Sequence, residues 1–142
     1  MIIVDTNVIM AFLITKGITE KIITQHRDTF ITPDHCFNEI WKHRNRWNNR
    51  NYSDTELRNV MGKVSRLFIY PVSKDVYSQF EKEASKLIDD IYDIPIVALA
   101  LAVENDGIWT YDTKHFKKEK LSPKIRLLST REVLELHPTK SK

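Results

Sequence analysis

The chain opens with Met1-Ile2-Ile3-Val4-Asp5, and this stretch decides the fold class. Residues 2–4 form a continuous β-branched run that ends at a carboxylate. A strand with apolar side chains on both faces must be covered on both faces, which is the usual setting of a parallel sheet. Further short strands are expected at residues 29–32, 107–112 and 125–128.

The segments between these strands have apolar residues at helical spacing. Val8, Ile9, Phe12 and Leu13 recur at helical spacing before Gly17, which is expected to stop that helix. Capping-box spacing predicts helix starts at Ser53 and at Ser129. Other helices are expected over residues 18–26, from 36 into the basic stretch near 44, over 75–87 and over 94–103. The sequence therefore predicts an α/β fold in which a parallel sheet of about four to five strands is sandwiched by helices in three α/β/α layers.

The length and composition fit one globular domain. The chain has 142 residues, of which 42% are hydrophobic and 29% charged. We expect a single domain over residues 1–137 and a loose tail over 138–142. The sole cysteine, Cys36, lies in a periodic apolar stretch and is expected to be a core residue. The longest apolar run, residues 94–103, is half of the roughly 20 residues that span a bilayer, and the N-terminus resembles no signal peptide. A cytoplasmic protein without a membrane contact is expected.

Positive charge is concentrated in two stretches. Residues 42–66 carry seven Lys and Arg against two acids, and residues 114–131 carry seven against one, within a net charge of +3. This arrangement suits a protein that binds a polyanion such as RNA, although a solvated surface is the structural alternative. The candidate RNA contacts are Arg44, Arg46, Arg50, Lys114 and Lys117.

Four acids are expected to meet at one edge of the sheet. Asp5 and Asp112 end two of the predicted strands, and ligands of open α/β sheets bind beyond the carboxyl ends of strands. Asp93 precedes the apolar helix, and Glu39 lies at the edge of a buried helical face. Each has a structural alternative: a helix N-cap for Asp5 and Asp93, a turn residue for Asp112, and a surface glutamate for Glu39.

Converging carboxylates repel one another unless a cation offsets their charge. The His and Cys residues lack zinc spacing, whereas Mg²⁺ and Mn²⁺ prefer oxygen ligands. Such an ion activates water and screens the charge of a phosphate ester. The pattern therefore predicts metal-dependent hydrolysis of phosphodiester bonds by a metal-activated water.

These motifs resemble the PIN-domain nucleases over residues 1–132. The resemblance is carried by Val4-Asp5-Thr6-Asn7, by Asn38-Glu39-Ile40, by Asp93-Ile94-Pro95 before an apolar helix, and by Ile108-Trp109-Thr110-Tyr111-Asp112 followed by Lys114-His115-Phe116. Membership implies a helix-covered parallel sheet, acid-bound Mg²⁺ or Mn²⁺, and endonucleolytic cleavage of RNA. By position, Asp5, Glu39, Asp93 and Asp112 would bind metal, and Asn7 and Thr110 would orient acids or water.

The resemblance also implies partners. Many prokaryotic members are VapC-like toxin ribonucleases of toxin–antitoxin pairs, often homodimeric and inhibited by a small antitoxin protein, and this chain has their size. Asp89 and Asp90 lie near Asp93, so the choice of Asp93 as ligand rests on the Ile-Pro that follows it. Some members carry a further acid where this chain has Thr113 to His115, which leaves the number of metal ions open.

Two other classes of phosphate-handling protein require motifs that this sequence lacks. A haloacid-dehalogenase phosphatase needs an acid at the position of Asn7, and a P-loop NTPase needs a Gly-rich Lys-Ser/Thr loop that the sequence lacks. The remaining alternatives are a housekeeping RNA-processing nuclease and a non-catalytic RNA-binding or regulatory module with the same fold.

Overall fold

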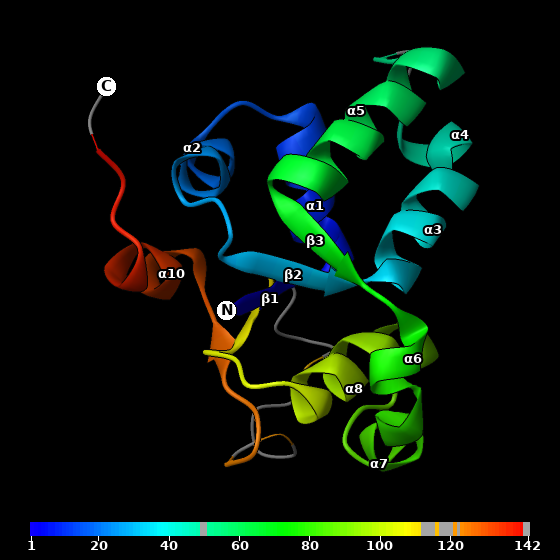
Figure 1. Ribbon diagram of the computed structural model, residues 1–142, viewed down its shortest axis with the longest axis vertical. Coiled ribbons are helices and arrows are strands. Elements are labelled where there is room, and N and C mark those ends of the chain that lie inside the picture. Colours follow the sequence, from blue (N-terminus) through cyan, green and yellow to red (C-terminus); the bar gives the residue numbers. More distant parts are fainter. Residues whose placement is uncertain (49–50, 112–115, 117–120, 122, 141–142) are drawn as a thin grey trace.

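The protein is built on a five-stranded parallel sheet (Figure 1). The computed structural model describes residues 1–48, 51–111, 116, 121 and 123–140. The strands lie side by side in the order β3-β2-β1-β4-β5. Their bounds are β1 (Ile2–Val4), β2 (Phe30–Pro33), β3 (Ile69–Val72), β4 (Ile108–Trp109) and β5 (Leu127–Leu128).

Helices cover both faces of this sheet, as the sequence predicted. In Figure 1, α1, α3 and α5 lie above the sheet and α6, α7 and α8 lie below it. The helices preceding β3 are α1 (Thr6–Ile14), α2 (Ile18–Gln25), α3 (Asp34–Lys42), α4 (Arg44–Trp47) and α5 (Asp54–Leu67). The later ones are α6 (Lys74–Tyr77), η1 (Ser78–Phe80), α7 (Glu81–Ser85), η2 (Ile91–Asp93), α8 (Ile94–Ala102) and α10 (Thr130–Leu136). The three-layer α/β/α fold is thereby confirmed.

The strand order reverses at β1. The chain runs outward from β1 through β2 to β3, and then crosses to the other side of β1 to form β4 and β5. At such a point the connections that follow two neighbouring strands leave in opposite directions, which opens a crevice between them. Ligands of open α/β sheets bind in this crevice. This point lies at the carboxyl ends of β1 and β4, beside Asp5 and Thr110.

The core is formed by the sheet and by the inner sides of the helices that cover it. Residues 95–100 of α8 are all buried, and β1 is buried throughout. The largest fully buried side chain is Trp109, whose ring centroid lies 5.7 Å from that of Phe30. Cys36 is also buried, so its expected place in the core is confirmed. Both predicted capping boxes form, at Ser53 before α5 and at Ser129 before α10.

Two parts of the predicted element order were wrong. The sequence reading omitted β3, which lies at the edge of the sheet and contains Pro71. Proline lacks the amide hydrogen that a central strand needs, so it is tolerated mainly at sheet edges. The single helix expected over residues 75–87 is instead the short sequence α6, η1 and α7. The first helix ends at Ile14, three residues before Gly17, which precedes α2.

The C-terminal residues contact α2. The backbone amide of Lys140 donates to Gln25 Oε1 at 2.7 Å, and Gln25 Nε2 donates to the Lys140 carbonyl at 3.2 Å. The carbonyl of Pro138 lies 2.8 Å from Nε2 of His26. These contacts involve the first residues of the segment expected to be loose. Within the described ranges, no helix has the length and apolarity needed to cross a membrane.

Candidate active site

Asp5 is fixed at the point where the strand order reverses. It follows β1 and is the N-cap of α1, where its Oδ1 accepts a hydrogen bond from the Val8 amide at 3.1 Å. Its Oδ2 accepts a hydrogen bond from the Thr110 hydroxyl, which follows β4. Both residues are buried, with exposed fractions of 4% for Asp5 and 3% for Thr110. Asp5 therefore caps a helix, which is its structural alternative, and it also lines a cavity.

The cavity beside Asp5 has a volume of about 410 Å³. Its walls come from the start of α1, from α3 and α4 and from η2, segments far apart in the sequence. Two further acids of the predicted set, Glu39 and Asp93, line it together with Asp5. The complete lining is Asp5, Thr6, Asn7, Met10, His35, Glu39, Ile40, His43, Arg46, Trp47, Tyr92 and Asp93.

Glu39 lies on α3 between two histidines. Nε2 of His43 is 3.0 Å from Glu39 Oε2, and Nε2 of His35 is 3.9 Å from Glu39 Oε1. The three side chains lie on one face because residues four apart on a helix are neighbours. The Glu39 side chain is 20% exposed, so it is reached from the cavity but partly shielded from solvent.

Asp93 ends η2 and immediately precedes α8. Burial raises the pKa of the nearby Cys36 thiol to about 11, and the negative charges of Asp5 and Asp93 contribute to the increase. Asp90, the alternative ligand in the sequence analysis, accepts a hydrogen bond from the Tyr92 amide at 2.9 Å and caps η2.

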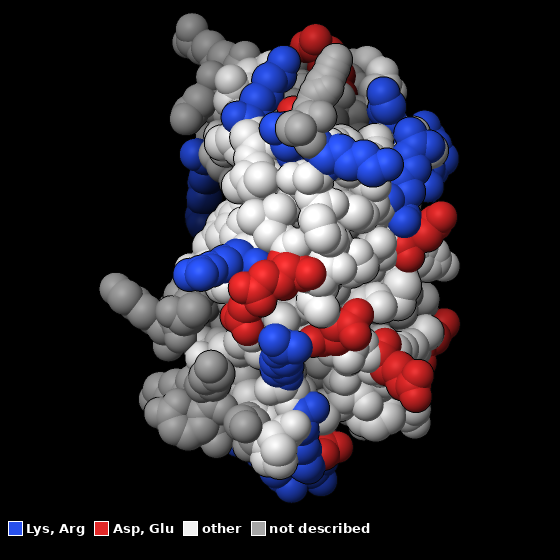
Figure 2. All heavy atoms as spheres, turned by 90° about the vertical axis from the view of Figure 1, so that its left-hand side faces the viewer, with Lys and Arg blue, Asp and Glu red and all other residues white. Residues whose placement is uncertain are grey.

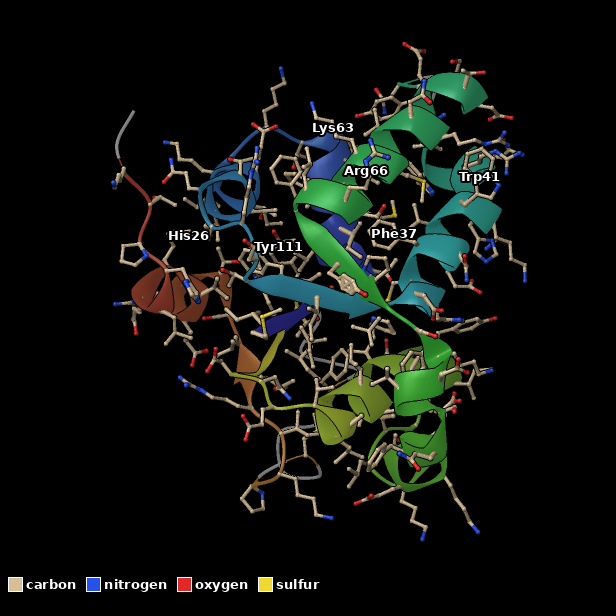
Figure 3. All side chains as sticks on the ribbon, in the orientation of Figure 1. His26, Phe37, Trp41, Lys63, Arg66 and Tyr111 are labelled. Carbon is tan, nitrogen blue, oxygen red and sulfur yellow. The ribbon has the colours of Figure 1, made fainter. Side chains whose placement is uncertain are left out.

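The structure describes only some of the other predicted site residues. Asn7 is exposed in the first turn of α1 and lines the cavity. Tyr111 follows Thr110, and its hydroxyl forms a hydrogen bond with that of Thr19 on α2 (Figure 3). This contact attaches the chain just before Asp112 to the N-terminal half of the fold. Asp112 itself lies outside the described residues.

The candidate RNA contacts occupy different surroundings. Arg46 is exposed and lines the cavity. Arg44 stacks on Trp41 at 4.1 Å and forms an ion pair with Asp54 at 3.0 Å. Trp41, labelled in Figure 3, also lies 5.0 Å from the guanidinium of Arg58. Figure 2 shows the opposite side of the molecule, that of α2 and α10, where Lys and Arg gather mainly toward the upper end. Arg50, Lys114 and Lys117 lie outside the described residues.

Comparison with protein families gives an independent result. The family model described as the PIN domain matches residues 3–132, which is most of the chain. The chain belongs to the PIN-domain family. A search of curated proteins returned no match. The PIN domain is a nuclease-type fold, and in this chain three of the four predicted acids line one cavity at its strand-order reversal.

Three side chains of this PIN-domain cavity were missed as functional candidates. His35 and His43 flank Glu39 at a spacing of four residues, and this helical spacing was visible in the sequence. Tyr92 precedes Asp93, but its position at the cavity depends on the short turn of η2, which the sequence does not indicate. Within the described part of the chain, no three carboxylate, imidazole or thiol side chains form a group that could hold a metal ion.

Proposed function

We propose that this PIN-domain protein is a metal-dependent endoribonuclease that cleaves RNA at the cavity lined by Asp5, Glu39 and Asp93. One observation carries the proposal: three carboxylates from separate segments line one cavity where the strand order of a parallel sheet reverses. Ordinary helix caps and surface glutamates need not share a cavity. The membership of the family supports nuclease chemistry at this position.

The carboxylates suit Mg²⁺ or Mn²⁺. Asp5, Glu39 and Asp93 line the same cavity, and a cation would offset the repulsion between their negative charges. Mg²⁺ usually binds one or two protein carboxylates and keeps several waters, and it therefore needs no complete protein cage. We assign Asp5, Asp93, Glu39 and Asp112 to this ion, some of them through its bound waters, because the three described acids do not form a direct three-ligand group. When bound, the ion would screen the charge of the scissile phosphate and lower the pKa of a water.

The side chains of the chain itself would orient the reaction. Thr110 and the Val8 amide hold the two oxygens of Asp5, so this carboxylate needs no reorientation when substrate arrives. His43 holds one oxygen of Glu39 in a similar way. Arg46 lies at the same cavity and would contact a phosphate of the RNA backbone. Asn7, at the first turn of α1, would position water or a phosphate oxygen.

The test is cleavage of a mixed RNA pool by purified protein with Mn²⁺, Mg²⁺ or EDTA. Asp93→Asn is compared with Asp90→Asn, a matched control because asparagine preserves the cap that Asp90 provides to η2. We expect cleavage by the unmodified protein and by Asp90→Asn, and its loss in EDTA and in Asp93→Asn. RNA binding without cleavage in either metal would favour the non-catalytic module. Loss in Asp90→Asn alone would move the ligand to Asp90.

We further propose that the protein is the toxin of a toxin–antitoxin pair and forms a homodimer. The support is the resemblance of its motifs and its size to those toxins. Induced expression should arrest bacterial growth, whereas expression of Asp93→Asn should not, and a small protein encoded beside it should relieve the arrest. Growth unaffected by active enzyme would favour the housekeeping nuclease. Light scattering of the purified protein would test the dimer.

A further inference from the structure

The acid-lined cavity also has an apolar and aromatic wall. Beside the carboxylates, its lining includes two aliphatic side chains and two large aromatic ones, namely Met10, Ile40, Trp47 and Tyr92. The proposed metal binding and phosphate contact use the carboxylates, Arg46 and Asn7 of this lining. The volume of about 410 Å³ lies within the roughly 300–1,000 Å³ usual for small-molecule sites. The cavity therefore has room and surface for a group more apolar than a phosphate.

The indole N–H of Trp47 is already hydrogen-bonded within the protein. The indole Nε1 donates to the Ile40 carbonyl at 2.9 Å, which fixes the ring against α3. The side chain is half-buried and lines the cavity. Its remaining contact surface is apolar, and an aromatic face of this kind stacks on a nucleobase without regard to base identity.

Tyr92 lies beside the candidate metal ligands but is open to solvent. Its side chain is 60% exposed, although it lines the same cavity as Trp47. The preceding backbone is fixed because the Tyr92 amide donates to Asp90 Oδ1 at 2.9 Å. The next residue is Asp93. An aromatic ring next to a carboxylate that would act on a phosphate is well placed to meet the base of the same nucleotide.

We propose that Trp47 and Tyr92 form a base-stacking subsite, which holds an unpaired nucleobase beside the scissile phosphate. Arg46, which lines the cavity with them, supplies the positive charge that accompanies aromatic stacking in single-strand binders. The inference rests on the proposed nuclease function and names the residues that would hold an unpaired base of its RNA substrate. A paired base is stacked within its duplex, and it must first be extruded at a cost in free energy before it can enter a cavity.

The experiment uses the Asp5→Asn protein in Mg²⁺, so that RNA is bound without being cut. The probes are a fluorescently labelled RNA of about 12 nucleotides, within the site sizes of single-strand binders, and the same strand annealed to its complement. Tyr92→Ala and Tyr92→Phe are added to this background. Tyr70→Ala is the matched control, because Tyr70 is also 60% exposed but lines a different cavity, beside Phe30 and Phe68. Affinities are measured by fluorescence anisotropy.

Tyr92→Ala removes the stacking ring and should weaken binding of the single-stranded RNA by about 5-fold or more. Tyr92→Phe keeps the ring and should retain the affinity, as should Tyr70→Ala. Binding of the duplex should not change in any of these variants. Single-strand affinity that is unchanged in Tyr92→Ala, or an equal loss with the duplex, would overturn the stacking subsite alone. Failure of the unmodified protein to bind or to cut either RNA in Mg²⁺ would overturn the proposed function as well.

Discussion

Asp5 and Glu39 line the same cavity, but the fold holds them in different ways. Asp5 is buried, and its two oxygens accept hydrogen bonds from a backbone amide and from the buried Thr110 hydroxyl. Glu39 is held by His43, whose side chain is 35% exposed. A carboxylate at the end of a central strand is thus fixed by the core, whereas one on a covering helix depends on a surface side chain. Substitutions around Asp5 should therefore reduce cleavage more than substitutions around Glu39.

Removal of the Asp5 charge is expected to have the largest effect. Asp5→Asn keeps a side chain that caps α1 but loses a proposed metal ligand. Cleavage should fall by more than the roughly 100-fold typical of changes in the groups that support a ligand. The melting temperature should stay the same or rise, because repulsion from Asp93 is removed. Cleavage rates and thermal unfolding measure the two outcomes, and a rate near that of the unmodified protein would remove Asp5 from the site.

Removal of the Thr110 hydroxyl should have the next largest effect. Thr110→Val keeps the shape of the side chain but removes the donor to Asp5 Oδ2. We expect cleavage to fall roughly 10- to 100-fold and stability to fall by about 1–3 kcal/mol, because a buried acceptor loses its partner. Thr110→Ser retains the hydroxyl and should preserve most of the activity. Equal rates for the valine and serine variants would show that this hydrogen bond is irrelevant to cleavage.

A change at His43 should be smaller still. His43→Ala removes the contact with Glu39 Oε2, and His43→Gln replaces it with an amide donor. Because Glu39 is partly exposed, water can replace the lost donor, and cleavage should fall by less than the roughly 10-fold lower limit for buried supporting groups. Steady-state kinetics at several Mg²⁺ concentrations would measure this. A loss of cleavage greater than that in Thr110→Val would mean that the support of Glu39 matters more for cleavage than the support of Asp5.

The smallest effect concerns the thiol beneath the cavity. Burial raises the pKa of Cys36 from 9.0 to about 11, so the folded protein keeps its proton where the unfolded chain loses it. The thiol therefore contributes stability below pH 9, and this contribution is lost as the pH rises from 9 toward 11. Cys36→Ala should lose less stability over that interval, as measured by urea unfolding at several pH values. Parallel decreases in the two proteins would contradict the raised pKa.

Much of the fold was predictable because its signals are local. The run Ile2-Ile3-Val4 can be buried on both faces only in a covered sheet, and the two capping boxes define helix starts without tertiary information. Strand β3 was missed because Tyr70 is exposed and Pro71 interrupts the pattern, and only pairing with β2 makes this segment a strand. The break of residues 75–87 into α6, η1 and α7 likewise follows from packing against α8.

The site was predicted in part for the same reason. Asp5 and Thr110 follow strands, and the sheet topology brings the ends of β1 and β4 together whatever the helices do. The choice between Asp90 and Asp93 depends on the one turn of η2, which local sequence does not determine. The roles suggested for Trp47 and Tyr92 depend on how α4 and η2 approach each other across the cavity. No local pattern encodes that approach.

We propose that Asp5, fixed by the ends of two strands, forms part of a divalent-cation site. The most direct measurement is Mn²⁺ binding, followed by electron paramagnetic resonance, to the unmodified protein, to Asp5→Asn and to Asp90→Asn. We predict saturable binding to the unmodified protein and to Asp90→Asn, and strongly weakened binding to Asp5→Asn. Equal Mn²⁺ affinity of the unmodified protein and Asp5→Asn would contradict the account.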